Sequence, residues 1–506
     1  MSALGPMSAL QSTILLTAVS LFSQAVGFLY RVLLSRMVGS EIMGLFHLVM
    51  PTFSVMMSLT SVGFTVACST LTARYRALGD HKAAAQALRH CLVGFLGSFG
   101  LVAVIVAPLS DAISVYLLGD ARTRLALVLL LPCLFLTGLE NLHKHAFYGS
   151  GRVGPPAFSE TCEQLIRAGA VLGLLWWFLP QNPERTVGLI VLGMILCEVF
   201  SAVTLTLLYH RYFGRRLTGE GIDPRGLGRQ VRHIALPIAW NSLLGNLMGA
   251  AQAVIIPQRL VRTGSDVSTA MSALGVLQGM TLPLLTLPTA FLSAMGLVLL
   301  PRLTQAVALG QKEAFRRRAD KALTATAWLI LPSAALLSVL APPLGRALFR
   351  EPAVGRFALP LAVTIVLVCF EAVLGVCLNG LGKQSVTARN SLIAGVVELS
   401  LTWWRMGKPG VGLKGYVEAF FVSTLLGMAL NWLALRRETG MEPQWFRWMV
   451  APGLSSLLAG LNINLLFPIF VETGLGELPA CLVCLLFGTL LYLCAMYAQG
   501  VFLDQT

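Results

Sequence analysis

Ionisable and amide side chains are set into long apolar stretches of this sequence, where each is costly to keep. An ionisable group at the centre of a bilayer costs about 2.5–3.5 kcal/mol on insertion scales. In the first stretch, Gln24 and Arg31 follow helical spacing on one polar stripe, and Arg36 lies at its boundary. We interpret Arg31 as facing an internal cavity. The alternatives are that it reaches the membrane surface or forms a structural ion pair.

Four further ionisable residues suit ion pairing or proton and cation binding. Glu163 precedes Arg167 by four residues, the favourable order for an ion pair along a helix. That pair is interpreted as structural, with a cavity-lining or coupling role as the alternative. Glu371 and Glu398 are isolated carboxylates in separate apolar stretches, which makes them candidate proton or cation sites.

Amides and prolines mark two other features. Asn241 and Gln252 fall near one stripe of a later apolar stretch, with Asn246 beside it; such amides bond helix to helix or bind a ligand. Prolines interrupt two long helices, where each is either a hinge or a static bend. These candidate hinges are Pro51, Pro283 and Pro288.

The composition requires these residues to be held by membrane helices. Of the 506 residues, 56% are hydrophobic and only 12% are charged, whereas soluble domains carry about 25% charged residues. This excludes a soluble enzyme, a disordered chain, a coiled coil and a disulfide scaffold. Each crossing needs about 20 apolar residues, and the sequence predicts about fourteen. They lie near 11–35, 42–70, 88–110, 124–148, 157–180, 186–209, 234–257, 268–300, 321–341, 354–378, 385–404, 411–433, 446–471 and 477–503.

The basic residues indicate the orientation of the chain. They gather in the loops that follow even-numbered helices, as in Arg74, Arg76 and Lys82 after the second. The positive-inside rule then places both termini in the cytoplasm. The net charge of +14 is therefore attributed to topology and contact with anionic membrane lipids, and not to nucleic-acid binding.

The two halves of the sequence resemble one another. The stretch LTARYRALGDHKAAAQALRH (71–90) matches RLTQAVALGQKEAFRRRADK (302–321) at a shift of 231 positions. This predicts an all-α polytopic fold of two pseudo-symmetric six-helix lobes followed by a C-terminal helix pair. The expected divisions are 1–209, a basic cytoplasmic linker at 210–233, 234–440 and 441–506.

No enzyme signature is present, and no cofactor or metal site is expected. The sequence lacks phosphate-binding, zinc-protease, nucleophile-elbow and EF-hand patterns. The ten cysteines lie in or beside apolar runs, and Cys481 and Cys484 are interpreted as packing residues.

Several stretches resemble the stage V sporulation protein B branch of the polysaccharide-transporter family. They include LFSQAVGFLYRVLLSRMVGSEIMGLFHLVMPTFSVMMSLTSVGFTVACSTLTARYRALGD near the N-terminus, LPIAWNSLLGNLMGAAQAVIIPQRL, LPLLTLPTAFLSAMGLVLLPRLTQA and NGLGKQSVTARNSLIAGVVE. The resemblance covers roughly 11–440. That family belongs to a superfamily of multidrug/toxin extruders, oligosaccharidyl-lipid flippases and lipid II flippases.

The resemblance implies a flippase that moves a lipid-linked saccharide of the undecaprenyl pyrophosphate type outward by alternating access. The setting would be the cytoplasmic membrane of a bacterium, during cell-wall or spore-cortex synthesis and with wall-synthesis proteins as possible partners. Arg31 and Arg36 lie where the lipid II branch uses arginines, and Arg31 could pair with the diphosphate. Gln24, Asn241 and Asn246 could bind the sugar, and Gln252 lies on the same cavity-facing stripe.

Two alternatives remain open. A cation-coupled multidrug/toxin exporter would use carboxylates such as Glu371 and Glu398. A membrane scaffold for wall assembly would not transport at all, and substitutions in its cavity would have no effect.

Overall fold

The fold is built from helices. The computed structural model describes residues 9–213 and 219–500, and no strand occurs within these ranges. The predicted all-α fold is confirmed. Helices suit this composition because each backbone N–H and C=O group is satisfied inside its own segment when no water is available. The chain packs as two compact units, Met1–Val254 and Ile255–Thr506.

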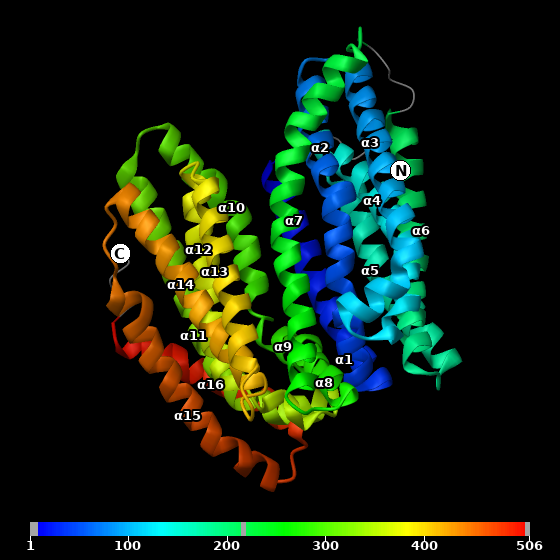
Figure 1. Cartoon of the computed structure of the whole chain (residues 1–506). Coiled ribbons are helices and arrows are strands. Elements are labelled where there is room, and N and C mark those ends of the chain that lie inside the picture. Colours follow the sequence, from blue (N-terminus) through cyan, green and yellow to red (C-terminus); the bar gives the residue numbers. More distant parts are fainter. Residues whose placement is uncertain (1–8, 214–218, 501–506) are drawn as a thin grey trace. The chain divides into compact units, whose positions relative to one another are not determined.

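The first unit opens with two helices joined at a glycine. α1 (Ala9–Met57) turns at Gly39, whose φ of 79° and ψ of 175° is accessible to glycine and strained for other residues. The first two predicted helices meet at this turn. The second continues through a wider turn, η1 (Ser58–Val62), into α2 (Gly63–Ala77) (Figure 1).

The other helices of the first unit follow the predicted segments, with longer ends. They are α3 (His81–Ala112), α4 (Arg124–Gly149), α5 (Gly154–Phe178), α6 (Pro183–Phe213) and most of α7 (Pro224–Arg262), with η2 (Ile113–Leu118) and η3 (Ala121–Thr123) between α3 and α4. The segment 210–233, expected as a linker, contains the end of α6 and the start of α7. Its residues 214–218 lie outside the described residues.

α7 packs closely against the helices that precede it. Leu227 and Val231 join a buried cluster with Cys68 and Leu71 of α2. At Gly63 a side chain would meet the backbone, because a Cβ there would lie 2.3 Å from the carbonyl oxygen of Ala235. The absence of a side chain at Gly63 therefore permits this helix contact.

The second unit repeats this arrangement. It contains the end of α7, α8 (Val267–Leu274), η4 (Gly275–Thr281), α9 (Leu282–Leu285), α10 (Thr289–Ala308), α11 (Lys312–Leu344), η5 (Gly345–Phe349), η6 (Pro352–Gly355), α12 (Ala358–Gly380), α13 (Gln384–Met406) and α14 (Leu413–Thr439). α12 and α13 both pack on α14, as α4 and α5 both pack on α6 in the first unit.

Local structure recurs at the spacing found in the sequence. α2 ends at Ala77 and α10 at Ala308, 231 positions later, and each helix is followed by a loop with a left-handed glycine. In both loops the N–H that follows the glycine donates back five residues, at 2.9 Å, to Tyr75 and to Ala306. The sequence repeat is therefore also a repeat of backbone structure.

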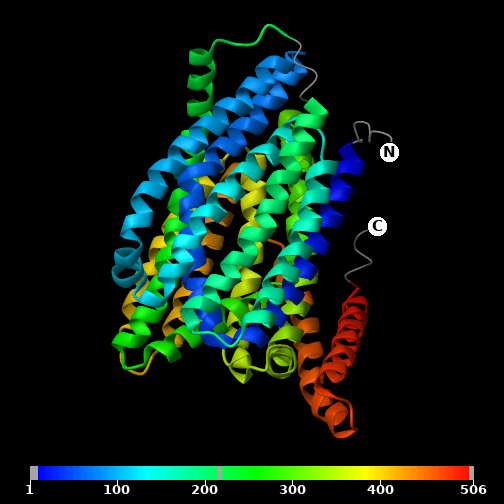
Figure 2. The same cartoon turned by 90° about the vertical axis from the view of Figure 1, so that its right-hand side faces the viewer.

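A helix hairpin completes the second unit. η7 (Phe446–Val450) leads into α15 (Ala451–Glu472), which packs against α16 (Glu477–Ala498) and α11 (Figure 2). Asp320 of α11 accepts from the indole N–H of Trp448 at 2.9 Å and from Arg447 at 3.4 Å. These bonds fix the start of the hairpin to α11.

Among the residues that the structure describes, eleven helices are long and apolar enough to cross a membrane. One of the eleven, 18–77, contains both predicted helices that meet at Gly39. α5 and α13, the fifth predicted helix of each half, are not among them. Both of these carry charged residues along their length. The protein is a multi-pass membrane protein, and the count of fourteen crossings remains a prediction.

The contact at Gly63 gives a stability prediction. Replacing Gly63 by alanine should destabilise the protein by about 1–3 kcal/mol, because the new Cβ meets rigid backbone. The control is Gly97→Ala in α3, which faces open space and should stabilise the helix by up to about 1 kcal/mol. Thermal unfolding in detergent measures both. Equal melting temperatures for the two variants would contradict the packing described.

Candidate functional site

The arginine of the first helix stands apart from the acidic side chains. Arg31 is half-buried, and within the described residues it forms no ion pair. Its electrostatic neighbours are Tyr30 and His47. Gln24 and Arg36 on the same helix are exposed. Arg31 is therefore available to an anion, as a guanidinium without a carboxylate partner would be.

His47 belongs to this site although its role could not be read from the sequence. Arg31 lies eight residues before Gly39, and His47 lies eight residues after it. The turn at Gly39 therefore brings the two side chains together. The Nε2 atom of His47 is buried and has no hydrogen-bond partner in the described part of the chain. One feature of the sequence could have identified His47: it lies as many residues after Gly39 as Arg31 lies before it, and Gly39 forms the turn.

The amides of α7 lie in different surroundings. Asn241 is exposed. Asn246 donates to the Ser58 hydroxyl at 2.7 Å and to the Ser54 carbonyl at 3.3 Å, so it joins α7 to η1 and α1. Gln252 is 8% exposed, and its amide nitrogen has no partner within the described residues.

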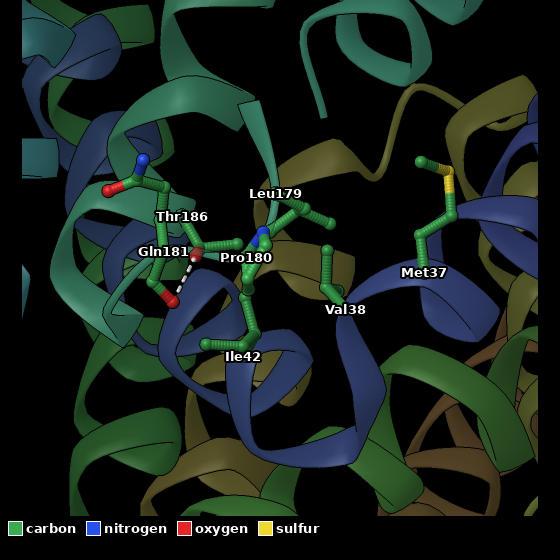
Figure 3. A pocket seen from close by; sticks show the side chains of 7 residues that line it. All are labelled: Met37, Val38, Ile42, Leu179, Pro180, Gln181 and Thr186. Atoms are coloured by element: carbon green, nitrogen blue, oxygen red, sulfur yellow. Dashed lines mark hydrogen bonds between the residues drawn. The ribbon is translucent and has the colours of Figure 1, made fainter. Parts of the chain in front are cut away.

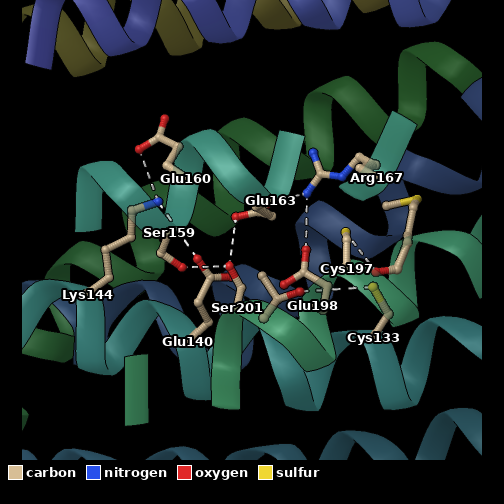
Figure 4. A network of polar contacts seen from close by, with 12 residues as sticks. Cys133, Glu140, Lys144, Ser159, Glu160, Glu163, Arg167, Cys197, Glu198 and Ser201 are labelled. Atoms are coloured by element: carbon tan, nitrogen blue, oxygen red, sulfur yellow. Dashed lines mark hydrogen bonds and ion pairs between the residues drawn. The ribbon is translucent and has the colours of Figure 1, made fainter. Parts of the chain in front are cut away.

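A buried ion-pair network occupies the first unit between α4, α5 and α6 (Figure 4). Arg167 contacts Glu163 and lies 3.2 Å from Glu198 Oε1. The Ser201 hydroxyl donates to Glu163 at 3.3 Å. The predicted pair of Glu163 and Arg167 is thus present, and Glu198 is the member that the sequence analysis did not connect to it.

A second cation extends the network. Lys144 lies 3.4 Å from Glu160 and 3.9 Å from Glu140. Carboxylates still outnumber cations here, and Glu198 Oε2 is buried without a partner among the described residues. The two cations therefore balance only part of the negative charge that the four carboxylates would carry when ionised.

The same network contains the geometry of a possible metal site. One ligand atom each of Glu163, Cys197 and Glu198 lies within 4.8 Å of the others. Arg167 already contacts both carboxylates. A metal ion placed there would be repelled by the guanidinium, so this group of side chains suits an internal ion pair better than a cation.

The equivalent positions of the second unit carry different charges. Glu371 and Glu398 follow Glu140 and Arg167 by 231 positions. Glu398 accepts from the Ser423 hydroxyl at 3.2 Å, and neither carboxylate forms an ion pair within the described residues. Glycine on α14 leaves room for the Glu371 carboxyl, since a Cβ at Gly427 would lie 2.3 Å from it.

The prolines expected as hinges occupy three kinds of position. Pro51 lies inside α1, and Pro283 lies in the first turn of α9. Pro288 directly precedes α10, so the long helix expected over 268–300 is interrupted at 286–288. Proline explains this break, because it cannot donate the backbone hydrogen bond that would continue the helix.

A cavity of about 360 Å³ lies beside the turn at Gly39 (Figure 3). Polar and apolar groups share its wall, and the Thr186 hydroxyl donates to the Gln181 carbonyl at 3.4 Å. The lining residues are Met37, Val38, Ile42, Leu179, Pro180, Gln181 and Thr186. None of the predicted binding residues lines it, so this cavity is separate from Arg31.

The network predicts the effect of removing its cation. Arg167→Leu should destabilise the protein by about 3–5 kcal/mol, because it leaves buried carboxylates uncompensated. Adding Glu198→Gln to that variant should recover part of the loss, because it removes one negative charge. Thermal unfolding in detergent measures both effects. An Arg167→Leu protein as stable as the control Arg185→Leu, at an exposed position, would contradict the role of the network.

Comparison with known proteins agrees with this architecture. The family model described as polysaccharide biosynthesis protein matches residues 9–307. Stage V sporulation protein B of Bacillus subtilis (strain 168) is 25% identical over 430 residues, covering 83% of this chain and 82% of the relative. The lipid II flippase MurJ of the same organism is 21% identical over 419 residues, covering 78% and 76%.

Solved structures share the fold. A lipid II flippase MurJ in an inward closed conformation superposes with a TM-score of 0.69 at 13% identity, covering 97% of this chain and all of the other. An inward-facing multidrug resistance MATE family transporter of the MOP superfamily also gives 0.69, at 16% identity, covering 82% and 94%. The relatives named as a lipid II flippase and as a multidrug transporter are membrane transport proteins, and at these identities their likeness to this chain shows a shared fold. Since the family model matches more than half of its length, the chain belongs to the polysaccharide biosynthesis protein family.

Proposed function

We propose that this protein is a flippase that moves a lipid-linked saccharide of the undecaprenyl pyrophosphate type across the bacterial cytoplasmic membrane. The observation that carries the proposal is Arg31, a half-buried guanidinium with no ion pair among the described residues. A diphosphate offers the negative charge and the oxygen pairs that a guanidinium binds best. Similarity to a protein named lipid II flippase supports this class of substrate.

His47 beside Arg31 and the other candidate side chains suit the two parts of such a headgroup. His47 can donate a further hydrogen bond to a phosphate oxygen through its unpartnered Nε2. Gln24 and Asn241 are exposed and can exchange hydrogen bonds with sugar hydroxyls. Gln252 is buried with a free amide nitrogen, whereas Asn246 holds α7 in place. Arg36 is exposed near the end of the same helix and suits first contact with the anion.

Alternating access needs points at which helices bend. The breaks around Pro283 and Pro288, and Pro51 within α1, are the candidate hinges of this proposal. Both termini lie in the cytoplasm in this scheme, following the distribution of basic residues. Enzymes that build the cell wall or spore cortex are the partners that such a substrate requires.

A second candidate is a cation-coupled multidrug exporter. It is favoured by Glu371 and Glu398, which have no ion pair among the described residues, whereas the carboxylates of the first unit have Arg167 and Lys144. Membrane carboxylates without an ion pair suit the binding of a proton or a cation. In the flippase proposal the same pair couples transport to an ion gradient.

The flippase proposal predicts the behaviour of Arg31 variants in proteoliposomes. Arg31→Ala should lower the rate of movement of a fluorescent undecaprenyl-linked saccharide at least about tenfold, because the diphosphate loses a charge-assisted contact of about 1.5–3 kcal/mol. Arg31→Lys should retain part of the rate, since it keeps the charge but not the planar fork. The rate is measured by quenching of the label on the outer leaflet.

Arg185→Ala, at an exposed position in the first turn of α6, is the matched control and should leave the rate unchanged. An unchanged rate in Arg31→Ala would remove this residue from the mechanism. If no saccharide moves and the vesicles instead export a cationic dye against an imposed proton or sodium gradient, with export lost in Glu371→Gln, the exporter would replace the flippase.

A further inference from the structure

A basic and aromatic surface lies in the second unit where α7 and α13 end. The Arg259 guanidinium is 3.8 Å from the centroid of Trp403, and the Lys408 ammonium is 3.9 Å from the centroid of Trp404. Arg405 lies 5.9 Å from the Trp404 ring. The Arg–Trp surface is defined here by Arg259, Arg262, Trp403, Trp404, Arg405 and Lys408.

The rings and the cations of this surface are held in place yet remain accessible. Trp403 and Trp404 are 56% and 53% exposed, so each ring has surface left to contact another molecule. Stacking on the rings orders the two cations. The Nη2 atom of Arg259 is buried and has no hydrogen-bond partner within the described residues.

The surface has more positive charge than its neighbours neutralise. Arg405 donates to Glu418 at 2.6 Å, but Arg259, Arg262 and Lys408 form no ion pair within the described part of the chain. Arg262 lies near enough to Arg259 for the two charges to repel. An anion brought to this surface would relieve that repulsion.

Two arginines elsewhere, Arg122 and Arg346, are each neutralised by an acidic neighbour. Arg122 pairs with Glu41 and Asp120, and Arg346 pairs with Glu477. At those two positions, unlike at the Arg–Trp surface, the positive charge is balanced by neighbouring carboxylates.

Helix dipoles account for only part of this arrangement. Arg259 and Arg262 lie in the last turn of α7, and Arg405 in the last turn of α13, where a cation is favoured. Lys408 lies in the loop that follows α13, and Lys414 lies in the first turn of α14, where the dipole disfavours a cation. The charge of these two lysines needs another explanation.

We propose that the Arg–Trp surface binds the phosphate-bearing headgroup of a lipid. Tryptophan rings settle at the level of lipid headgroups, with an apolar body and a polar edge. Guanidinium and ammonium groups beside them supply charge-assisted hydrogen bonds to phosphate oxygens. The phosphate could belong to an anionic phospholipid of the bilayer or to a lipid-linked diphosphate, and the two share this chemistry.

Native mass spectrometry of the full chain in detergent tests the proposal without requiring transport. The probes are phosphatidylglycerol, undecaprenyl diphosphate and the zwitterionic phosphatidylcholine, each titrated separately. The double variant Arg259→Gln, Lys408→Gln should bind the first two at least about tenfold more weakly, because two charge-assisted contacts are lost. The control Arg356→Gln is exposed, also stacks on a ring, at 5.4 Å from Phe357, and should bind as the unmodified protein does.

The titrations distinguish a phospholipid from a lipid-linked diphosphate as the source of the phosphate. Loss of binding for phosphatidylglycerol supports a bulk phospholipid site, and loss for undecaprenyl diphosphate alone supports a site for the lipid carrier. Arg259→Lys with Lys408→Arg keeps both charges and should retain most of the binding, and a melting temperature of the glutamine double variant equal to that of the unmodified protein would exclude misfolding as the cause. Binding of phosphatidylcholine as tight as that of the two anionic lipids, or unchanged binding of the anionic lipids in the double variant, would overturn the proposal.

Discussion

A charge inside an apolar helix needs an opposite charge, water or a bound partner, because its surroundings cannot solvate it. Arg167 meets this requirement with Glu163 and Glu198, and Lys144 meets it with two more carboxylates. Arg31 has no such partner within the described residues, although its helix is as apolar. Arg167 therefore stabilises the helix bundle through its ion pairs, whereas Arg31 is available to bind an anion.

The internal repeat sharpens this distinction. α2 in the first half corresponds to α10 in the second, and the loops that follow them have the same backbone hydrogen bond, so the two halves share a scaffold. The charged residues on this scaffold differ between the two halves. Where the first half has Glu140 and Arg167, the second has Glu371 and Glu398, and neither of these two carboxylates forms an ion pair among the described residues. The first half places cations beside its buried carboxylates, whereas the proposed coupling role of the second half rests on Glu371 and Glu398, which have no cation partner among the described residues. A flippase with one substrate-binding and one coupling half would be built in this way.

Apolar runs and the repeat predicted much of the helical fold, since each helix in a membrane is defined by its own composition. The Glu163–Arg167 pair was also predictable, because four-residue spacing brings both side chains to one face. Contacts between helices were not predictable, because periodicity does not say which faces meet. Glu198 joining Arg167, His47 beside Arg31, and Asn246 bonding to Ser58 all depend on packing. At Pro288 the sequence predicted a hinge or a static bend within one long helix, whereas the structure ends one helix at Leu285 and begins the next at Thr289.

The central claim is that Arg31 recognises the diphosphate of a lipid-linked saccharide, and equilibrium binding tests it most directly. Purified protein and its Arg31→Ala variant would be titrated with undecaprenyl diphosphate saccharide and with uncharged undecaprenol. The account predicts that the unmodified protein prefers the diphosphate lipid and that Arg31→Ala loses this preference while still binding undecaprenol. Equal affinity of the unmodified protein for both lipids, or an unchanged preference in Arg31→Ala, would contradict it.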